Sequence, residues 1–90
     1  MPFPRYNLTK KTYVGLGIYL GFKPSHRRSE MALHGVDYDE VVAELTKVGL
    51  IRNGRLFNSE GRFAFNERYP NVLPSQVHMY KHSVDFAENG

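Results

Sequence analysis

Residues 34–57 read HGVDYDEVVAELTKVGLIRNGRLF and carry the strongest local structural signals of the 90-residue chain. Apolar residues recur at helical spacing after Asp37, and Gly49 follows as the kind of residue that ends helices in a left-handed conformation. Asp37 is placed to cap the first turn, with Glu40 reaching back in a capping box. The spacing predicts a helix over about residues 38–48.

An Asn-Gly pair at residues 53–54 follows this helix, between two short apolar runs. It predicts a β-hairpin, because both residues accept positive φ. A two-residue turn places Arg52 opposite Arg55 on one face, where like charges cost stability. The two arginines either grip an anion or form a solvated face whose long stems cover apolar surface. The sequence leaves both interpretations open.

Residues 58–61, Asn-Ser-Glu-Gly, predict a second turn that leads into a third strand over residues 62–65. The register of this turn stays open. If Phe57 opposes Arg62, the three arginines share one face, whereas Asn58 opposite Arg62 would move it to the other face. In the first register the core is lined by Ile51, Leu56, Phe63 and Phe65.

Residues 12–22 alternate like a strand, but they also fit a helix that Asn7 could cap. We favour the helix, because residues 23–25, Lys-Pro-Ser, would then break it. A second short helix follows and ends at His34 and Gly35.

The remaining segments complete a single domain over residues 1–90, with residues 70–90 as a C-terminal extension. Within it, residues 75–86 fit a terminal helix or an edge strand equally well. The sequence therefore predicts an α+β fold, in which two to three helices precede a two- or three-strand antiparallel hairpin or meander.

Composition narrows the class of protein. A chain of this length has a small core, and the absence of cysteine excludes disulfides and thiolate metal sites. No apolar run approaches the roughly 18 residues of a membrane span. No secretory signal is visible, so we expect a cytoplasmic protein that does not enter membranes.

The net charge of +3 is distributed unevenly. Residues 1–30 carry +5, residues 31–50 carry −3, and residues 51–69 carry +2. Segments of opposite net charge favour partners that carry the complementary charge. The candidate residues for binding nucleic acid or another anion are Lys10, Lys11, Arg27, Arg28, Arg52, Arg55 and Arg62. The candidate residues for docking on a basic protein are Asp37, Asp39, Glu40 and Glu44, although carboxylates at a helix start more often serve the helix itself.

The order of elements over about residues 26–65 resembles a winged-helix domain, the helix-turn-helix variant with a β-hairpin wing. The resemblance rests on Met31, Ala32 and Leu33 before Gly35, on Val41 and Leu45, and on the Gly-Leu-Ile that leads into the hairpin. It implies that the helix after Asp37 enters the DNA major groove and that residues 52–55 lie against phosphate. The four carboxylates of this helix depart from that pattern, because they would meet a polyanion.

No constellation for catalysis is visible, and no cofactor is implied. His78, His82 and Asp85 share a face if helical, but a surface pair is favoured over a zinc site that lacks a fourth ligand. We therefore expect a small non-enzymatic, winged-helix-like protein. It would be a nucleic-acid-binding or regulatory protein that uses its basic N-terminal and hairpin residues. Its acidic helix would turn away or pack on a second subunit, as in a homodimer. The alternative is an adaptor or inhibitor, of the type encoded by phages and mobile elements, whose acidic helix docks on a larger complex.

Overall fold

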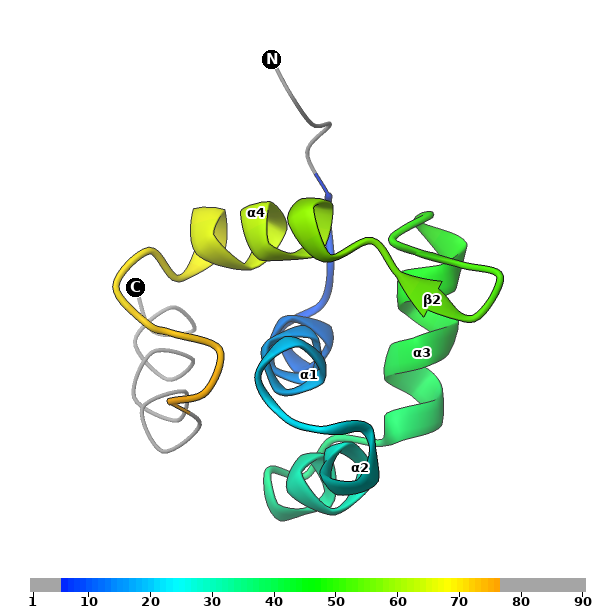
Figure 1. Ribbon diagram of the computed structural model, residues 1–90, viewed down its shortest axis with the longest axis vertical. Helices are drawn as coiled ribbons and strands as arrows, with labels where there is room; N and C mark the ends of the chain where they lie inside the picture. Colours follow the sequence, from blue (N-terminus) through cyan, green and yellow to red (C-terminus); the bar gives the residue numbers. More distant parts are fainter. Residues whose placement is uncertain (1–5, 77–90) are drawn as a thin grey trace.

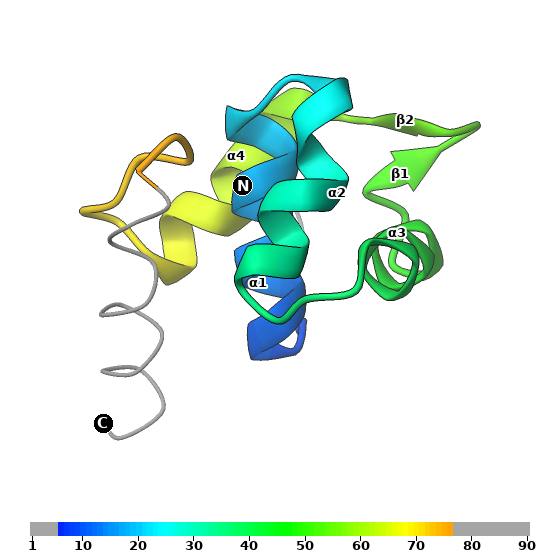
Figure 2. The ribbon, with the colours of Figure 1, turned by 90° about the horizontal axis from the view of Figure 1, so that it is seen from below.

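The computed structural model describes residues 6–76 of the chain. These residues form four helices and one two-stranded antiparallel sheet, a small α+β fold. The elements are α1 (Lys10–Gly21), α2 (Pro24–Leu33), α3 (Tyr38–Lys47), β1 (Ile51–Arg52), β2 (Arg55–Leu56) and α4 (Asn58–Arg68). Helix α1 runs through the middle, with α2, α3 and α4 packed around it (Figure 1). The hairpin projects beside α3, as Figure 2 shows.

Helix α1 confirms the helical interpretation of residues 12–22. Its cap is Thr9, not Asn7, because Thr9 Oγ1 accepts a hydrogen bond from the backbone N–H of Thr12 at 3.3 Å. The helix is surrounded by other elements, and Leu16 and Ile18 have no exposed surface. A helix buried on most sides is apolar on most sides, which explains why its sequence also alternates like a strand.

Helix α2 begins with Pro24 at its first position, where the missing N–H costs nothing. Met31 is its one buried residue. Gly35 follows the helix with φ of +69°, and the N–H of Val36 donates to the carbonyl of Met31 at 2.9 Å. The chain thereby turns within four residues into α3, which lies crosswise to α2 (Figure 1, Figure 2).

Helix α3 confirms the prediction for residues 38–48, and Gly49 ends it with φ of +88°. The predicted side-chain cap is wrong. Asp37 occupies the cap position through its backbone, since its carbonyl accepts from the N–H of Val41 at 3.1 Å. Its exposed carboxylate makes no capping hydrogen bond.

The hairpin is confirmed with its register, which pairs Ile51 with Leu56 and Arg52 with Arg55. Asn53 and Gly54 take φ of 54° and 75°, as the turn requires. The predicted third strand is wrong, because residues 62–65 belong to α4.

Helix α4 forms because its small and aromatic residues recur at helical spacing. Gly61, Ala64 and Phe65 are its buried residues. Gly61 faces the side chains of Leu16 and Leu56, and a Cβ at this position would lie 3.4 to 3.5 Å from them, in ordinary van der Waals contact. Both predicted strand registers of Arg62 are therefore wrong, because Arg62 is an exposed residue of a helix.

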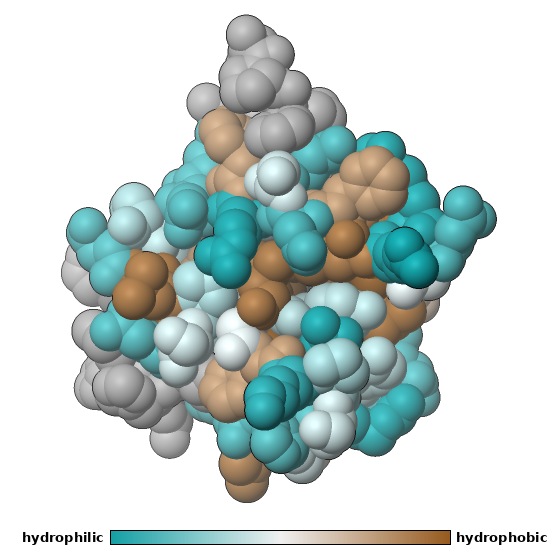
Figure 3. Space-filling model, in the orientation of Figure 1, coloured by the Kyte–Doolittle hydropathy of each residue, from teal (hydrophilic) through white to brown (hydrophobic). Residues whose placement is uncertain are grey.

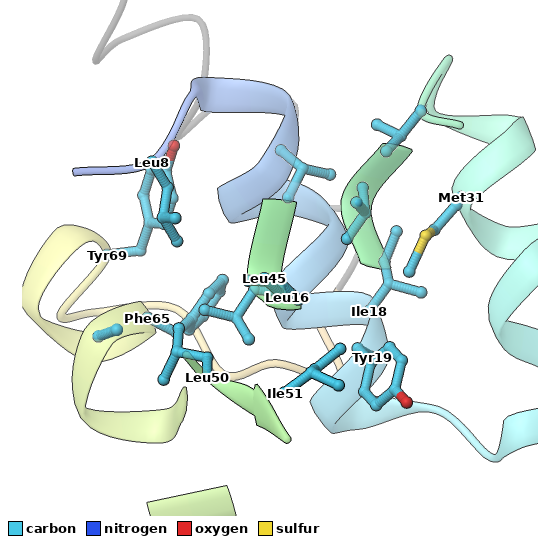
Figure 4. Packing of buried hydrophobic residues seen from close by; sticks show 14 of the residues in the cluster. Leu8, Leu16, Ile18, Tyr19, Met31, Leu45, Leu50, Ile51, Phe65 and Tyr69 are labelled. Atoms are coloured by element: carbon cyan, nitrogen blue, oxygen red, sulfur yellow. The ribbon is translucent and has the colours of Figure 1, made fainter. Parts of the chain in front are cut away.

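The core lies between α1 and the elements around it, where Leu45 and Leu50 meet Leu16 and Phe65 (Figure 4). Phe63, expected in the core, is half-buried. Residues 69–76 return to α1 and bury Val72 and Pro74. The rest of the C-terminal extension, with most of residues 75–86, lies outside the described part of the chain. Of the helices within residues 6–76, none has the length and apolarity needed to cross a membrane.

Candidate nucleic-acid interface

Two tyrosines and two arginines form a layered stack where α1, α2 and α3 meet. The rings of Tyr19 and Tyr38 stack with centroids 6.3 Å apart and planes 19° apart. The guanidinium carbon of Arg27 lies 3.9 Å from the centroid of the Tyr19 ring, and that of Arg28 lies 4.4 Å from the Tyr38 centroid. Cation–π attraction of this kind holds a planar cation over a ring face.

Hydrogen bonds and charge fix the two arginines further. Arg27 Nε donates to the carbonyl oxygen of Tyr19 at 3.1 Å. Arg28 Nη2 lies 3.4 Å from a carboxylate oxygen of Asp39, and both side chains remain mostly exposed. These contacts attach the N-terminal half of α2 to α1 and α3. They matter there because this half of α2 buries little apolar surface of its own. The stack therefore helps to hold α2 against α1 and α3, while Arg28 keeps 66% of its side-chain surface exposed.

Arg52 on the hairpin is held by three contacts. Its Nε donates to the carbonyl oxygen of Gly49 at 2.7 Å, and its Nη2 lies 3.3 Å from Glu60 Oε2. Its guanidinium carbon lies 3.9 Å from the centroid of the Phe57 ring. Glu60 also accepts a hydrogen bond from the Tyr6 hydroxyl at 2.8 Å. Glu60, in the first turn of α4, thus offsets the repulsion between Arg52 and Arg55, which face each other in the hairpin.

Arg55 and Arg62 are exposed, and no ion pair or hydrogen bond joins either of them to residues 6–76. Arg55 flanks the turn at the end of the hairpin. Arg62 lies on α4. Among the predicted hairpin arginines, Arg55 is therefore available to a ligand at once, whereas Arg52 already has internal partners.

Lys10 and Lys11 begin α1 and line an open hollow of about 420 Å³ between α1 and α3. Asp37 and Glu40 line the same hollow. Glu44 also lines it, but its carboxylate is turned onto α1. It accepts from the Thr12 hydroxyl at 2.8 Å and from the Thr9 backbone N–H at 3.2 Å.

The structure divides the seven basic candidates among separate places. Lys11 and Tyr19, against which Arg27 stacks, are eight residues apart on α1, or about 12 Å along the helix axis. The lysines therefore lie toward one end of α1 and the α2 arginines toward the other. A single continuous basic surface does not result.

The acidic candidates are also divided. Asp37, Asp39 and Glu40 are exposed, and Asp39 is neutralised in part by Arg28. Glu44 is half-buried and serves the α1 terminus. Asp37 and Glu40 thus remain as exposed carboxylates at the start of α3, beside the hollow that Lys10 and Lys11 also line.

Sequence reasoning missed the aromatic partners of the arginines and the carboxylate that holds Arg52: Tyr19, Tyr38, Phe57 and Glu60. The signal for Glu60 was its place in the first turn of a helix that began with Asn and Ser. Within residues 6–76, no group of three His, Cys, Asp or Glu side chains is placed to hold a metal ion. His78, His82 and Asp85 lie outside that range.

A comparison of the chain with known protein families, with curated proteins and with solved structures finds no match.

Proposed function

We propose that this chain is a small, non-enzymatic, winged-helix-like protein that binds nucleic acid mainly through the phosphate backbone. The observation that carries the proposal is Arg55, an exposed guanidinium beside a tight turn with no partner in residues 6–76. Its neighbour across the hairpin, Arg52, is already positioned by Gly49 and Glu60. A phosphate would relieve the crowding of positive charge at the turn.

The arrangement of the helices supports the same class. Helices α2 and α3 lie crosswise and are joined through Gly35, as in helix-turn-helix units. The hairpin directly follows α3, in the place of a wing. Arg27 and Arg28 add two oriented guanidinium groups on α2.

The acidic character of α3 argues for backbone contact in place of major-groove reading. Asp37 and Glu40 would face the phosphates of both strands if α3 lay in the groove. Glu44 and Asp39 would repel the phosphates less, because each carboxylate already has an internal partner. In the proposed complex the hairpin and the start of α2 face the ligand, and the hollow between α1 and α3 faces away from it.

Fluorescence anisotropy with labelled DNA and RNA oligonucleotides tests the proposal. We expect binding at low salt that weakens steeply as salt rises. Arg55→Glu should lose most of this affinity. Lys11→Glu makes the same change of charge near the other end of α1 from the α2 arginines and should lose clearly less. If no oligonucleotide binds at low salt, or if the two variants behave alike, the proposal is wrong.

A second candidate function is an adaptor or inhibitor that docks through α3 on a basic protein surface. The exposed carboxylates of Asp37 and Glu40 beside the hollow favour it, as does Leu33, which is 77% exposed at the end of α2. Capture of a stoichiometric protein partner from nuclease-treated lysate, lost in Asp37→Lys with Glu40→Lys, would support it. Glu44 should be left intact in that test, because it holds α1.

A further inference from the structure

The base of the hairpin presents an aromatic ring covered by an oriented cation. Phe57 is 40% exposed, one of three large apolar residues in the described range with that much exposure. The other two, Leu33 and Leu73, are aliphatic. Apolar surface extends alongside α4 toward the hairpin, between hydrophilic side chains (Figure 3).

Backbone hydrogen bonds anchor Phe57 on both sides. Its N–H donates to the carbonyl of Leu50 at 2.9 Å, and its carbonyl accepts from the N–H of Gly61 at 2.8 Å. The residue is therefore fixed between the end of the hairpin and the first turn of α4. Its partly exposed ring therefore projects from a backbone that is hydrogen-bonded on both sides.

Arg52 extends this ring into a layered surface. Its guanidinium lies 3.9 Å above the Phe57 ring centroid and is oriented by Gly49 and Glu60. The Arg52 side chain nevertheless keeps 47% of its surface exposed. A planar group from a ligand can stack on exposed ring or guanidinium surface without first ordering either side chain.

Arg55 supplies a charge beside the stack. It pairs with Arg52 in the hairpin register, so both side chains leave the same face. With no partner in residues 6–76, Arg55 is able to bind an anion. The face therefore combines a stacking surface with a cation, which is the combination that binds a nucleobase and its adjacent phosphate.

We propose that Phe57 and Arg52 form a platform on which an unpaired nucleobase stacks, while Arg55 binds a neighbouring phosphate. The inference rests on the proposed function and narrows its ligand to single-stranded DNA or RNA. Bases within a duplex already stack on their neighbours, so their faces are closed to such a platform. A single strand also removes the need to place the acidic α3 in a groove.

The test uses the absence of tryptophan from the chain. Phe57→Trp introduces a unique fluorophore into the platform, and Leu73→Trp places one at another exposed apolar position. A single-stranded oligonucleotide should quench the indole fluorescence of the Phe57→Trp variant saturably and leave that of the Leu73→Trp variant unchanged. By anisotropy, the same oligonucleotide should bind the parent chain more tightly alone than when annealed to its complement.

Two further variants separate stacking from charge. Phe57→Leu keeps an apolar side chain at the same position but removes the aromatic face, and it should weaken single-strand binding about tenfold with an unchanged salt dependence. Arg55→Glu should instead make the plot of log binding constant against log salt concentration less steep, by about 1 or more in slope. Circular dichroism of each variant verifies that the fold is retained.

The outcomes distinguish this inference from the proposed function. If oligonucleotides bind but the duplex is preferred, the platform is wrong and nucleic-acid binding stands. The same conclusion follows if Phe57→Leu binds as well as the parent and the fluorescence of Phe57→Trp is not quenched. If no oligonucleotide binds, the platform and the proposed function are both wrong.

Discussion

Gly15 of α1 lies so close to Val41 of α3 that no side chain fits between them. A Cβ added to Gly15 would lie 2.5 Å from Val41 Cγ2 and 2.8 Å from Cγ1. Val41 is 2% exposed, and its Cβ, which no side-chain rotation can move, would itself lie 3.1 Å from the added atom. This contact sets how closely the two helices approach, and α3 in turn positions the hairpin.

We therefore expect Gly15→Ala to destabilise the fold, although alanine favours helices. Overpacking of a full core costs about 1–3 kcal/mol, against a helix-propensity gain of about 1 kcal/mol. Gly61→Ala is the matched control, because its Cβ would lie 3.4 Å or more from Leu56 and Leu16, in ordinary contact. Urea unfolding should show a loss for Gly15→Ala and a gain or no change for Gly61→Ala. Equal effects would contradict the packing argument.

Glu44 joins α3 to the first turn of α1 through Thr9 and Thr12. Removing its carboxylate leaves the Thr12 hydroxyl, in a residue that is 3% exposed, without that acceptor. Hydrogen bonds to charged groups contribute about 1.5–3 kcal/mol, so Glu44→Ala should lower the free energy of unfolding by an amount in that range. Glu40→Ala, on the exposed side of the same helix, should change it by less than about 0.5 kcal/mol. Denaturant titration of the two variants side by side tests this difference.

The helix α3 and the hairpin were predictable because their signals are local. Gly49, Asn53 and Gly54 take the positive φ angles that their residue types favour, and the apolar stripe of α3 meets the core. Helix α4 was missed for the opposite reason. Gly61 suggests a turn in the sequence, and its packing against Leu16, which lies 45 positions away, cannot be read from the residues around it.

The candidate site shows the same contrast between features set by local sequence and features set by long-range contacts. Register alone placed Arg52 opposite Arg55. The partners of Arg52 could not be found without α4, because that helix carries Glu60 and fixes Phe57 at its start. Carboxylates were assigned to a docking face from their position on α3, yet the hydroxyls that engage Glu44 come from another element. Long-range contacts of this kind have no signature in the sequence of either partner.

Tyr13 and Tyr69 form an edge-to-face pair with ring centroids 6.2 Å apart, but their hydroxyls differ. The Tyr13 hydroxyl donates to the carbonyl oxygen of Tyr6 at 2.9 Å, whereas the buried Tyr69 hydroxyl has no partner in the described part of the chain. Tyr13→Phe should therefore cost about 1 kcal/mol of stability, and Tyr69→Phe should cost nothing or add stability. Thermal unfolding of both variants measures the contrast. A clear loss in Tyr69→Phe would mean that its hydroxyl has a partner outside residues 6–76.

Alkaline pH should destabilise the fold through its tyrosines. Burial is the main cause that raises the pKa of Tyr6, Tyr19 and Tyr69 above the ordinary value of 10.0, and the hydrogen bond to Glu60 adds to the effect at Tyr6. Because the folded pKa exceeds the unfolded one, the unfolded chain releases these protons first. The contribution to stability is complete below pH 10.0 and is lost as the pH rises through the folded pKa values. Urea unfolding measured from about pH 8 to about pH 11 should show a flat region and then a decline. Tyr69→Phe should make that decline shallower, and an unchanged slope in this variant would show that Tyr69 does not contribute to it.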